Sequence, residues 1–235
     1  MSSAAKQTEP PAPELSTVVS GDEGGARTVV ERRDGVLDGE ALIYGENGAL
    51  MLRATYRKDK LEGLSLCYND DGELIQKAMY RQGFLDGETV IYENGQIQMV
   101  VRYVAGKREG EAVVYNAGAL SSRLIFRNDR LHGRCIWYGQ EGGVAKVAEY
   151  AAGKEEGPTL LYFPDGTVQE RAMYRGGVLE GEVLTYHPSG ARKRKAFYRA
   201  GKPEGDAQEF DESGKPAGEE DTEGVGWFGL LRGKS

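Results

Sequence analysis

The sequence has few of the features that would assign it to a membrane, a secretory route or metal chemistry. Its 235 residues include only two cysteines and two histidines. No apolar run approaches the roughly 20 residues that cross a bilayer, and residues 1–25 lack the apolar core of a signal peptide. Two cysteines, Cys67 and Cys135, fit a reducing compartment. We therefore expect a cytoplasmic protein.

A basic footprint is also missing. The formal net charge is −7, residues 28–205 sum to zero, and residues 206–223 alone carry eight acidic residues and one lysine. Nucleic-acid-binding domains usually carry a basic face, and anionic lipid attracts polybasic clusters. The charge balance therefore argues against a nucleic-acid partner and makes a membrane partner unexpected.

Sequence motifs of the common catalytic sites are absent. The chain contains no P-loop, no G-x-G-x-x-G after a predicted strand, no H-E-x-x-H and no G-x-S-x-G. Two histidines in different parts of the chain, His132 and His187, form neither a metal site nor a triad. We predict a non-enzymatic protein with no catalytic residues, no cofactor and no metal.

Aromatic residues, by contrast, follow a period of 23 or 24 residues. All thirteen tyrosines fall into two columns. The first column is Tyr56, Tyr80, Tyr103, Phe126, Tyr150, Tyr174 and Tyr198, and the second is Tyr44, Tyr68, Tyr92, Tyr115, Tyr138, Tyr162, Tyr186 and Phe210. Such a period predicts tandem structural repeats.

Glycine follows the same period in three columns. The chain has 34 glycines, about twice the usual share, and glycine is favoured where a tight turn needs positive φ. The regular column is Gly39, Gly63, Gly87, Gly110, Gly133, Gly157, Gly181 and Gly205, and a second is Gly48, Gly72, Gly95, Gly118, Gly142, Gly166, Gly190 and Gly214. The third is Gly35, Gly83, Gly106, Gly153, Gly177 and Gly201, with Asp59 and Asp129, which tolerate the same geometry, in the other two units.

Each unit is predicted to be a β-hairpin. Residues 88–92 and 96–103 are rich in β-branched and aromatic side chains, and a short loop with Gly95 lies between them. Eight units predict an all-β, elongated, single-layer antiparallel sheet of sixteen strands, roughly 75 Å long at about 4.75 Å per strand. Cys67 and Cys135 lie three units apart, so we expect no disulfide between them.

The pattern Y-x-x-G-x-x-x-G, then Y-x-x-G, resembles MORN repeats of the variant type found in bacteria. Residues 80–88 and 92–95 illustrate it, and the resemblance covers about residues 32–218. It implies a twisted single sheet and, among bacteria, an antitoxin or immunity role. We expect a disordered tail over 1–27, the repeat array over 28–218, and an acidic linker with an apolar peptide over 219–235.

A column of basic residues is the main candidate for partner binding. It lies three residues before the first tyrosine column and contains Arg53, Lys77, Arg123, Arg171 and Lys195, with Val100 and Val147 in the remaining units. The glutamates that follow the regular glycine, Glu40, Glu88, Glu111 and Glu182, are placed to pair with this column across strands. Two interpretations stay open: a solvated charge ladder, or part of a partner-binding face.

Two other features complete the prediction. An acidic residue precedes the regular glycine in seven of the eight units, and we interpret this repeated position as part of the turn. In the C-terminal peptide, Trp227, Phe228 and Leu231 are either a cap on the last repeat or anchors for a partner. Two functions follow: a protein that neutralises a toxin or effector, encoded nearby, by direct binding, or a scaffold at a membrane surface.

Overall fold

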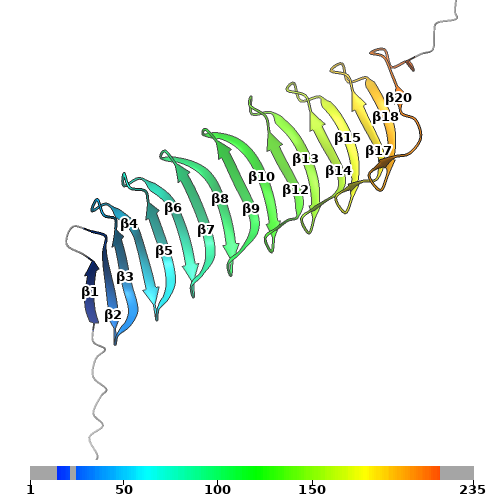
Figure 1. The fold of residues 1–235 in the computed structure, drawn as a ribbon. Coiled ribbons are helices and arrows are strands. Elements are labelled where there is room, and N and C mark those ends of the chain that lie inside the picture. The colour runs from blue at the N-terminus through cyan, green and yellow to red at the C-terminus, as the bar shows by residue number, and fades with distance from the viewer. Residues whose placement is uncertain (1–14, 22–24, 218–235) are drawn as a thin grey trace, which may run out of the picture.

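The computed structural model describes residues 15–21 and 25–217, which form one antiparallel sheet. Hairpins that follow one another in sequence lie side by side, and their strands are bent along their length (Figure 1). The strands are β1 (Leu15–Gly21), β2 (Arg27–Arg33), β3 (Val36–Tyr44), β4 (Leu50–Arg57), β5 (Lys60–Tyr68), β6 (Leu74–Arg81), β7 (Phe84–Glu93), β8 (Gln96–Val104), β9 (Lys107–Asn116), β10 (Ala119–Arg127), β11 (Arg130–Leu131), β12 (Gly133–Tyr138), β13 (Val144–Ala151), β14 (Lys154–Tyr162), β15 (Val168–Arg175), β16 (Val178–Leu179), β17 (Gly181–Tyr186), β18 (Arg192–Arg199), β19 (Lys202–Pro203) and β20 (Gln208–Glu209). The described residues contain no helix, and the predicted all-β architecture of tandem hairpins is confirmed.

The number of rows in the sheet differs from the prediction by one. Three rows are interrupted and count as two strands each, namely β11 with β12, β16 with β17, and β19 with β20. The twenty strands therefore form seventeen rows. The additional row is β1, which pairs with β2 along its whole length. The expectation of a disordered tail over 1–27 is wrong for this segment, because Thr17, Val18 and Val19 are β-branched residues that favour a strand.

One long edge of the sheet consists of two-residue turns, and we call it the tight-turn edge. In each turn both central residues have positive φ, as in Gln82 (52°) and Gly83 (86°), which is the type I′ geometry that matches the twist of a hairpin. The third glycine column occupies the second turn position, and its two aspartates, Asp59 (62°) and Asp129 (64°), adopt the same conformation. The interpretation of these aspartates as turn residues is confirmed.

The opposite long edge consists of longer loops, and we call it the wide-turn edge. In the first of these loops the N–H of Gly45 donates to the carbonyl of Ala49, and the N–H of Gly48 donates to the carbonyl of Gly45, both at 2.9 Å. Three residues thus connect the paired ends. Only two residues do so at Asn94–Gly95 and at Ala117–Gly118. This one-residue difference is why two of the repeat steps are 23 residues and not 24.

Most of the buried residues are small side chains in one layer on one face of the sheet, which we call the small-residue face. Its central residues are between 0 and 7 % exposed and are Ala41, Ala54, Ser65, Ala78, Thr89, Val101, Ala112, Cys135, Ala148, Thr159, Ala172, Val183 and Ala196. The regular glycine of each hairpin is the direct cross-strand neighbour of the first-column aromatic residue, as in Gly63 with Tyr80 and Gly110 with Phe126. The first-column aromatic rings, half-buried except for the buried Phe126, border the row of small residues, and none of the described residues forms a second layer above it.

Neighbouring repeats are joined along the tight-turn edge by the acidic residues that precede the regular glycines. A carboxylate of one unit accepts the backbone N–H of the first turn residue in the next unit, at 2.7 to 3.2 Å. The pairs are Glu62 with Gln82, Asp86 with Ala105, Glu109 with Asn128, Glu156 with Gly176, and Glu180 with Ala200. The interpretation of this position as part of the turn is wrong, because most of these acids lie within strands, as Glu62 does in β5 and Glu109 in β9. The structure shows instead that five of them accept a hydrogen bond from the turn of the following repeat.

The structure keeps the two cysteines of the chain far apart. Cys67 and Cys135 are free thiols, as predicted, and lie in β5 and β12, six rows apart. Burial raises the pKa of both thiols, so neither is an activated nucleophile at neutral pH. In the described part of the chain, no helix is long and apolar enough to cross a membrane.

Candidate partner-binding surface

The predicted basic column lies in one unbroken row across the sheet. On the face opposite the small-residue face, each basic residue is the direct cross-strand neighbour of aliphatic residues from the adjoining strands. We call this set the cationic row, and in spatial order it is Leu42, Arg53, Leu66, Lys77, Val90, Val100, Val113, Arg123, Ile136, Val147, Leu160, Arg171, Leu184 and Lys195. Directly opposed residues in a β-ladder point to the same face. The row is therefore a continuous stripe, roughly 60 Å long at about 4.75 Å per strand.

Three of the five cations in the row are paired with carboxylates. Arg53 contacts Glu40 at 2.6 Å, Arg123 contacts Glu111 at 3.4 Å, and Lys195 contacts Glu182 at 2.8 Å. Each glutamate directly follows a regular glycine, as the charge-ladder interpretation predicts. The Arg53 and Arg123 pairs are largely exposed and the Lys195 pair is half-buried. Surface ion pairs typically contribute little to stability, about 0–1 kcal/mol.

The remaining two cations, Lys77 and Arg171, have no carboxylate at ion-pair distance among the described residues. Both side chains are exposed. In their repeats the position after the regular glycine is Leu64 or Pro158 instead of glutamate. Three cations of the row therefore form cross-strand ion pairs, and the other two present a positive charge without a described carboxylate partner.

The aliphatic members of the row form a platform between the charges. Val90, Val147 and Leu184 are only 5 to 8 % exposed, and the other aliphatic members are half-buried. Where valine replaces the cation, three aliphatic side chains follow one another without interruption, as in Ile136, Val147 and Leu160. Apolar surface interspersed with arginine is a common composition at protein interfaces.

A second set of cations lies outside this row, on the tight-turn edge. Twelve lysines and arginines occupy its two-residue turns and their flanking positions, and all are exposed: Arg33, Arg57, Lys58, Lys60, Arg81, Lys107, Arg127, Arg130, Lys154, Arg175, Arg199 and Lys202. The sequence pattern reveals the arginines that follow the tyrosines but not the lysines beyond the turn. The acidic residues that join the repeats lie directly behind these cations and offset much of their charge.

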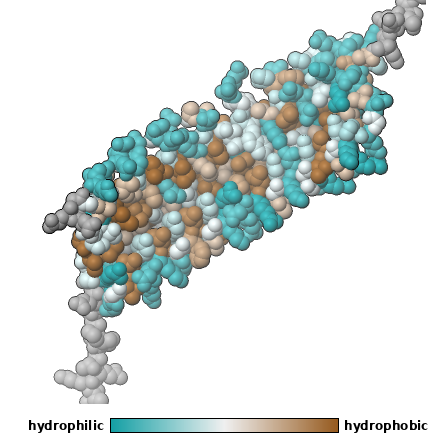
Figure 2. All heavy atoms as spheres, viewed as in Figure 1, coloured by the Kyte–Doolittle hydropathy of each residue, from teal (hydrophilic) through white to brown (hydrophobic). Residues whose placement is uncertain are grey.

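The loops of the wide-turn edge are rich in acidic residues. Its loops carry nine acidic residues, which are Glu46, Asp70, Asp71, Glu73, Glu93, Glu141, Asp165, Asp211 and Glu212. Hydrophilic residues line both long borders of the molecule, and hydrophobic residues gather between them, mainly in the N-terminal half (Figure 2). Acidic residues therefore dominate the loops of the wide-turn edge, whereas cations and the repeated acids are mixed on the tight-turn edge.

A polar cluster interrupts the small-residue face in the fifth and sixth repeats. The Tyr150 hydroxyl and the Lys146 ammonium both donate to Glu155 Oε1, at 3.1 and 2.5 Å, and the rings of Trp137 and Tyr150 are 6.1 Å apart. Burial raises the pKa of Tyr150, and the Glu155 carboxylate that it contacts raises it further. The phenol stays protonated at neutral pH, so we assign the cluster a packing role. Sequence reasoning missed it because Trp137, Lys146 and Glu155 each occur in one repeat only.

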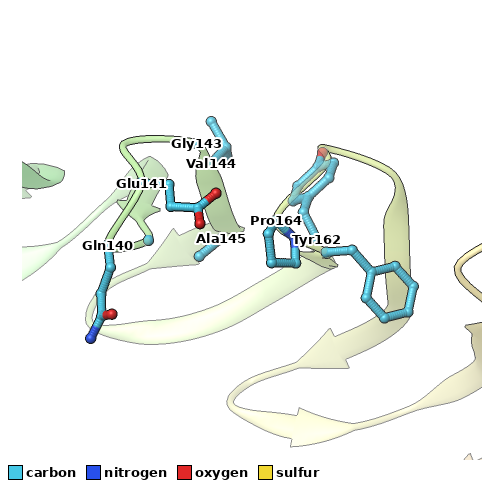
Figure 3. Close-up of a pocket in the computed structure, with 9 residues that line it drawn as sticks. Gln140, Glu141, Gly143, Val144, Ala145, Tyr162 and Pro164 are labelled. Atoms are coloured by element: carbon cyan, nitrogen blue, oxygen red, sulfur yellow. The ribbon is translucent and has the colours of Figure 1, made fainter.

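A shallow hollow of about 290 Å³ lies between two loops of the wide-turn edge. Glu141 and Pro164 come from the two facing loops (Figure 3), and Val144, Ala145 and Tyr162 complete most of the wall. The hollow contains none of the predicted binding residues and is lined by one carboxylate without a cationic or nucleophilic side chain. It offers no group arrangement for catalysis.

The two histidines lie in different repeats and do not come together. His187 Nε2 donates to the carbonyl oxygen of Phe210 at 3.0 Å, and His132 lies on the tight-turn edge in another repeat. In the described part of the chain no three His, Cys, Asp or Glu side chains are grouped so as to hold a metal ion. Trp227, Phe228 and Leu231 lie outside the described residues.

Comparison with known proteins bears on the repeats. The family model of the MORN repeat variant matches residues 179–200. This stretch spans the hairpin of β17 and β18, with Gly181 opposite Tyr198. The match supports a MORN-repeat protein. The same glycine and tyrosine spacing continues through the other hairpins of the described chain. No curated protein matches the chain.

Proposed function

We propose that this chain is a non-enzymatic binding protein of the antitoxin or immunity type, which acts in the cytoplasm by covering a partner protein. MORN-type repeats support the coarser assignment to a repeat-based binding protein. The cationic row is the observation that carries the finer one. It offers a stripe roughly 60 Å long, whereas a standard interface needs only about 800 Å² on each partner.

The charges and apolar side chains of the row indicate what kind of protein surface would complement it. A cation that already contacts a carboxylate attracts a partner's carboxylate only weakly. Lys77 and Arg171 are exposed and have no carboxylate at ion-pair distance among the described residues. Aliphatic side chains separate the cations along the row. The complementary surface is therefore a protein face that presents carboxylates around apolar residues. Arginine commonly dominates the binding energy at such interfaces.

The experiment is co-expression with the product of the adjacent gene, with cell survival as the readout. Arg171→Glu should abolish most of the protection, because it reverses an uncompensated charge on the row. Arg123→Glu should have a smaller effect, because Glu111 already neutralises that arginine. Arg175→Glu is the matched control, since it changes an exposed arginine of the same strand that lies on the tight-turn edge. All three melting temperatures should stay near that of the wild type.

Two results would contradict this proposal. Full protection by Arg171→Glu at wild-type protein levels would exclude the cationic row as the binding face. A wild-type protein that neither protects nor binds the co-expressed product would contradict the antitoxin assignment itself.

A scaffold at a membrane surface is the second candidate, and the tight-turn edge is the observation that favours it. Twelve exposed cations along one edge suit an anionic lipid surface, although the net charge of −7 opposes the attraction. Sedimentation with vesicles that contain an anionic phospholipid tests it. Binding that Arg175→Glu weakens and Arg171→Glu leaves intact would favour the scaffold over the antitoxin.

A further inference from the structure

The two ends of the sheet differ in how much backbone they leave open. At the N-terminal end, β1 contributes seven residues and pairs with β2 on one side only. Its outer edge has no partner within the described residues. At the C-terminal end, the last row consists of β19 and β20, with two residues each. A long open edge and a short, broken one therefore terminate the same sheet.

The outer edge of β1 carries none of the features that discourage strand pairing. Its sequence, Leu15–Gly21, contains no charged residue and no proline. Val18 and Val19 are 39 and 61 % exposed. Long, uncharged edge strands present a row of free N–H and C=O groups that pair readily with another strand. An isolated edge of this kind is a binding site for an extended segment.

The last row, unlike β1, carries features that discourage strand pairing. Pro203 lacks a backbone N–H, and Glu204, Asp206 and Glu209 place negative charge at this end. Charges and proline are the usual protection of an edge against pairing. Head-to-tail addition, in which β1 of one copy pairs with the last row of another, is disfavoured for this reason. That leaves β1 itself as the matching edge.

We propose that the occupant is β1 of a second copy, paired antiparallel across a two-fold axis. With the axis at Val18, the strand is nearly self-complementary: Ser16 lies opposite Ser20, Thr17 opposite Val19, and Val18 opposite its own counterpart. Directly opposed β-branched residues stabilise a ladder. The dimer is closed, because pairing uses the only long open edge of each described chain. This inference stands independently of the proposed function.

The dimer has a consequence for the binding surface. When a residue and its own two-fold copy lie opposite each other in a ladder, their side chains point to the same face. The two copies of each sheet face then lie on one side of the combined sheet. Two cationic rows would be presented together, and the dimer would be a bivalent binder of whatever the row recognises.

The interface is small, which sets the expected affinity. Seven residue pairs cover about 23 Å of strand, at the low end of specific interfaces. We therefore expect a reversible dimer with a Kd on the order of 1–10 µM. Sedimentation velocity of the full chain between about 0.5 and 100 µM should show a shift from monomer to dimer over this range.

Substitution separates the strand pairing from other modes of association. Val18→Lys places two like charges opposite each other at the axis, so the dimer should weaken more than tenfold. Val178→Lys is the matched control, since Val178 is a 43 % exposed valine on the tight-turn edge. It should leave the dimer unchanged. Circular dichroism and the melting temperature of both variants should match the wild type, because each new lysine is exposed.

A cysteine cross-link tests the register directly. In a Cys67→Ser background, Val18→Cys should form a covalent dimer on mild oxidation, and Val19→Cys should form much less, because only Val18 faces its own copy. The proposal is overturned by a chain that remains monomeric at about 100 µM, by a dimer that survives Val18→Lys with unchanged affinity, or by assemblies that grow beyond the dimer.

Discussion

The two long edges of the sheet connect the same strands with different chemistry. On the wide-turn edge the polar side chains mostly bond within their own loop, as in the contacts from Asp165 to Thr167 and from Asp211 to Ser213. Among the described loops, two side-chain bonds join neighbouring repeats there: Asn47 donates to the carbonyl of Asp70, and His187 donates to the carbonyl of Phe210. On the tight-turn edge the repeated carboxylates bond the next repeat. Cohesion between repeats is thus concentrated on one side of the sheet.

This difference bears on how successive hairpins are held at a fixed spacing in a sheet that has no second layer among the described residues. Side-chain bonds along one edge fix the spacing of successive turns, and the backbone bonds between turns, such as Gly83 N–H to Leu61 carbonyl at 2.9 Å, reinforce it. The loops of the other edge are held mainly by bonds within themselves and contribute fewer side-chain bonds between repeats. In repeat proteins stability depends mainly on contacts between neighbours. Damage to the tight-turn edge should therefore cost more than equivalent damage to the wide-turn edge.

The largest effect is expected from Gly110→Val. Gly110 has a φ of +87° and lies opposite Phe126, and a β-branched residue in this conformation is strained by about 1–3 kcal/mol. Val100→Ala, at a half-buried position in the neighbouring strand, should cost less than about 1 kcal/mol. Urea unfolding measures both free energies, and equal values would refute the positive φ assigned to Gly110.

A smaller effect should follow from removing one inter-repeat carboxylate. Glu109→Ala leaves the N–H of Asn128 without its acceptor, which we expect to destabilise the fold by about 1 kcal/mol and to reduce cooperativity between the flanking repeats. Asp165→Ala removes bonds confined to one loop and should shift the unfolding midpoint less. If Asp165→Ala shifted the midpoint as much as Glu109→Ala, the two edges would contribute alike.

The smallest effect concerns acid pH. A bond from the backbone N–H of Arg108 lowers the pKa of Asp129, and bonds from Thr167 lower the pKa of Asp165. A carboxyl with a lowered pKa in the folded state stabilises the fold above its unfolded pKa of about 3.9, and this contribution is lost as the pH falls through the folded value. Melting temperatures between about pH 6 and pH 2.5 should therefore decline less in Asp129→Asn than in the wild type.

Much of this architecture could be predicted from the sequence, because glycines and tyrosines recur at the same positions from repeat to repeat. Gly63, Gly83 and Gly95 represent three columns whose positive φ values are all found in the structure. Even the two short repeats are visible in the 23-residue spacings from Tyr80 to Tyr103 and from Tyr103 to Phe126. The single strand β1 was missed because it belongs to no repeat.

The details of the candidate surface were less accessible. The row of alternating cations and aliphatic residues depends on the strand register, which joins Arg171 to Leu160 and Leu184. Once that register is known, the sequence explains why Arg171 has no carboxylate partner among the described residues. Glu111, which pairs with Arg123, follows a regular glycine, and the equivalent position in the repeat of Arg171 is Pro158. The partner of each repeated acid could not be predicted, because it lies in a turn about 20 residues away.

Hydrogen exchange of the turn amides tests the central claim, that the repeats are joined along the tight-turn edge, most directly. The first turn residues Gln82, Ala105 and Asn128 donate to carboxylates of the preceding repeat, although such solvent-facing turn amides ordinarily exchange fast. They should exchange at least roughly tenfold more slowly than the amide of Glu141 in a wide-turn loop, and Glu109→Ala should release Asn128 selectively. Exchange of all four amides at the same unprotected rate would contradict the account.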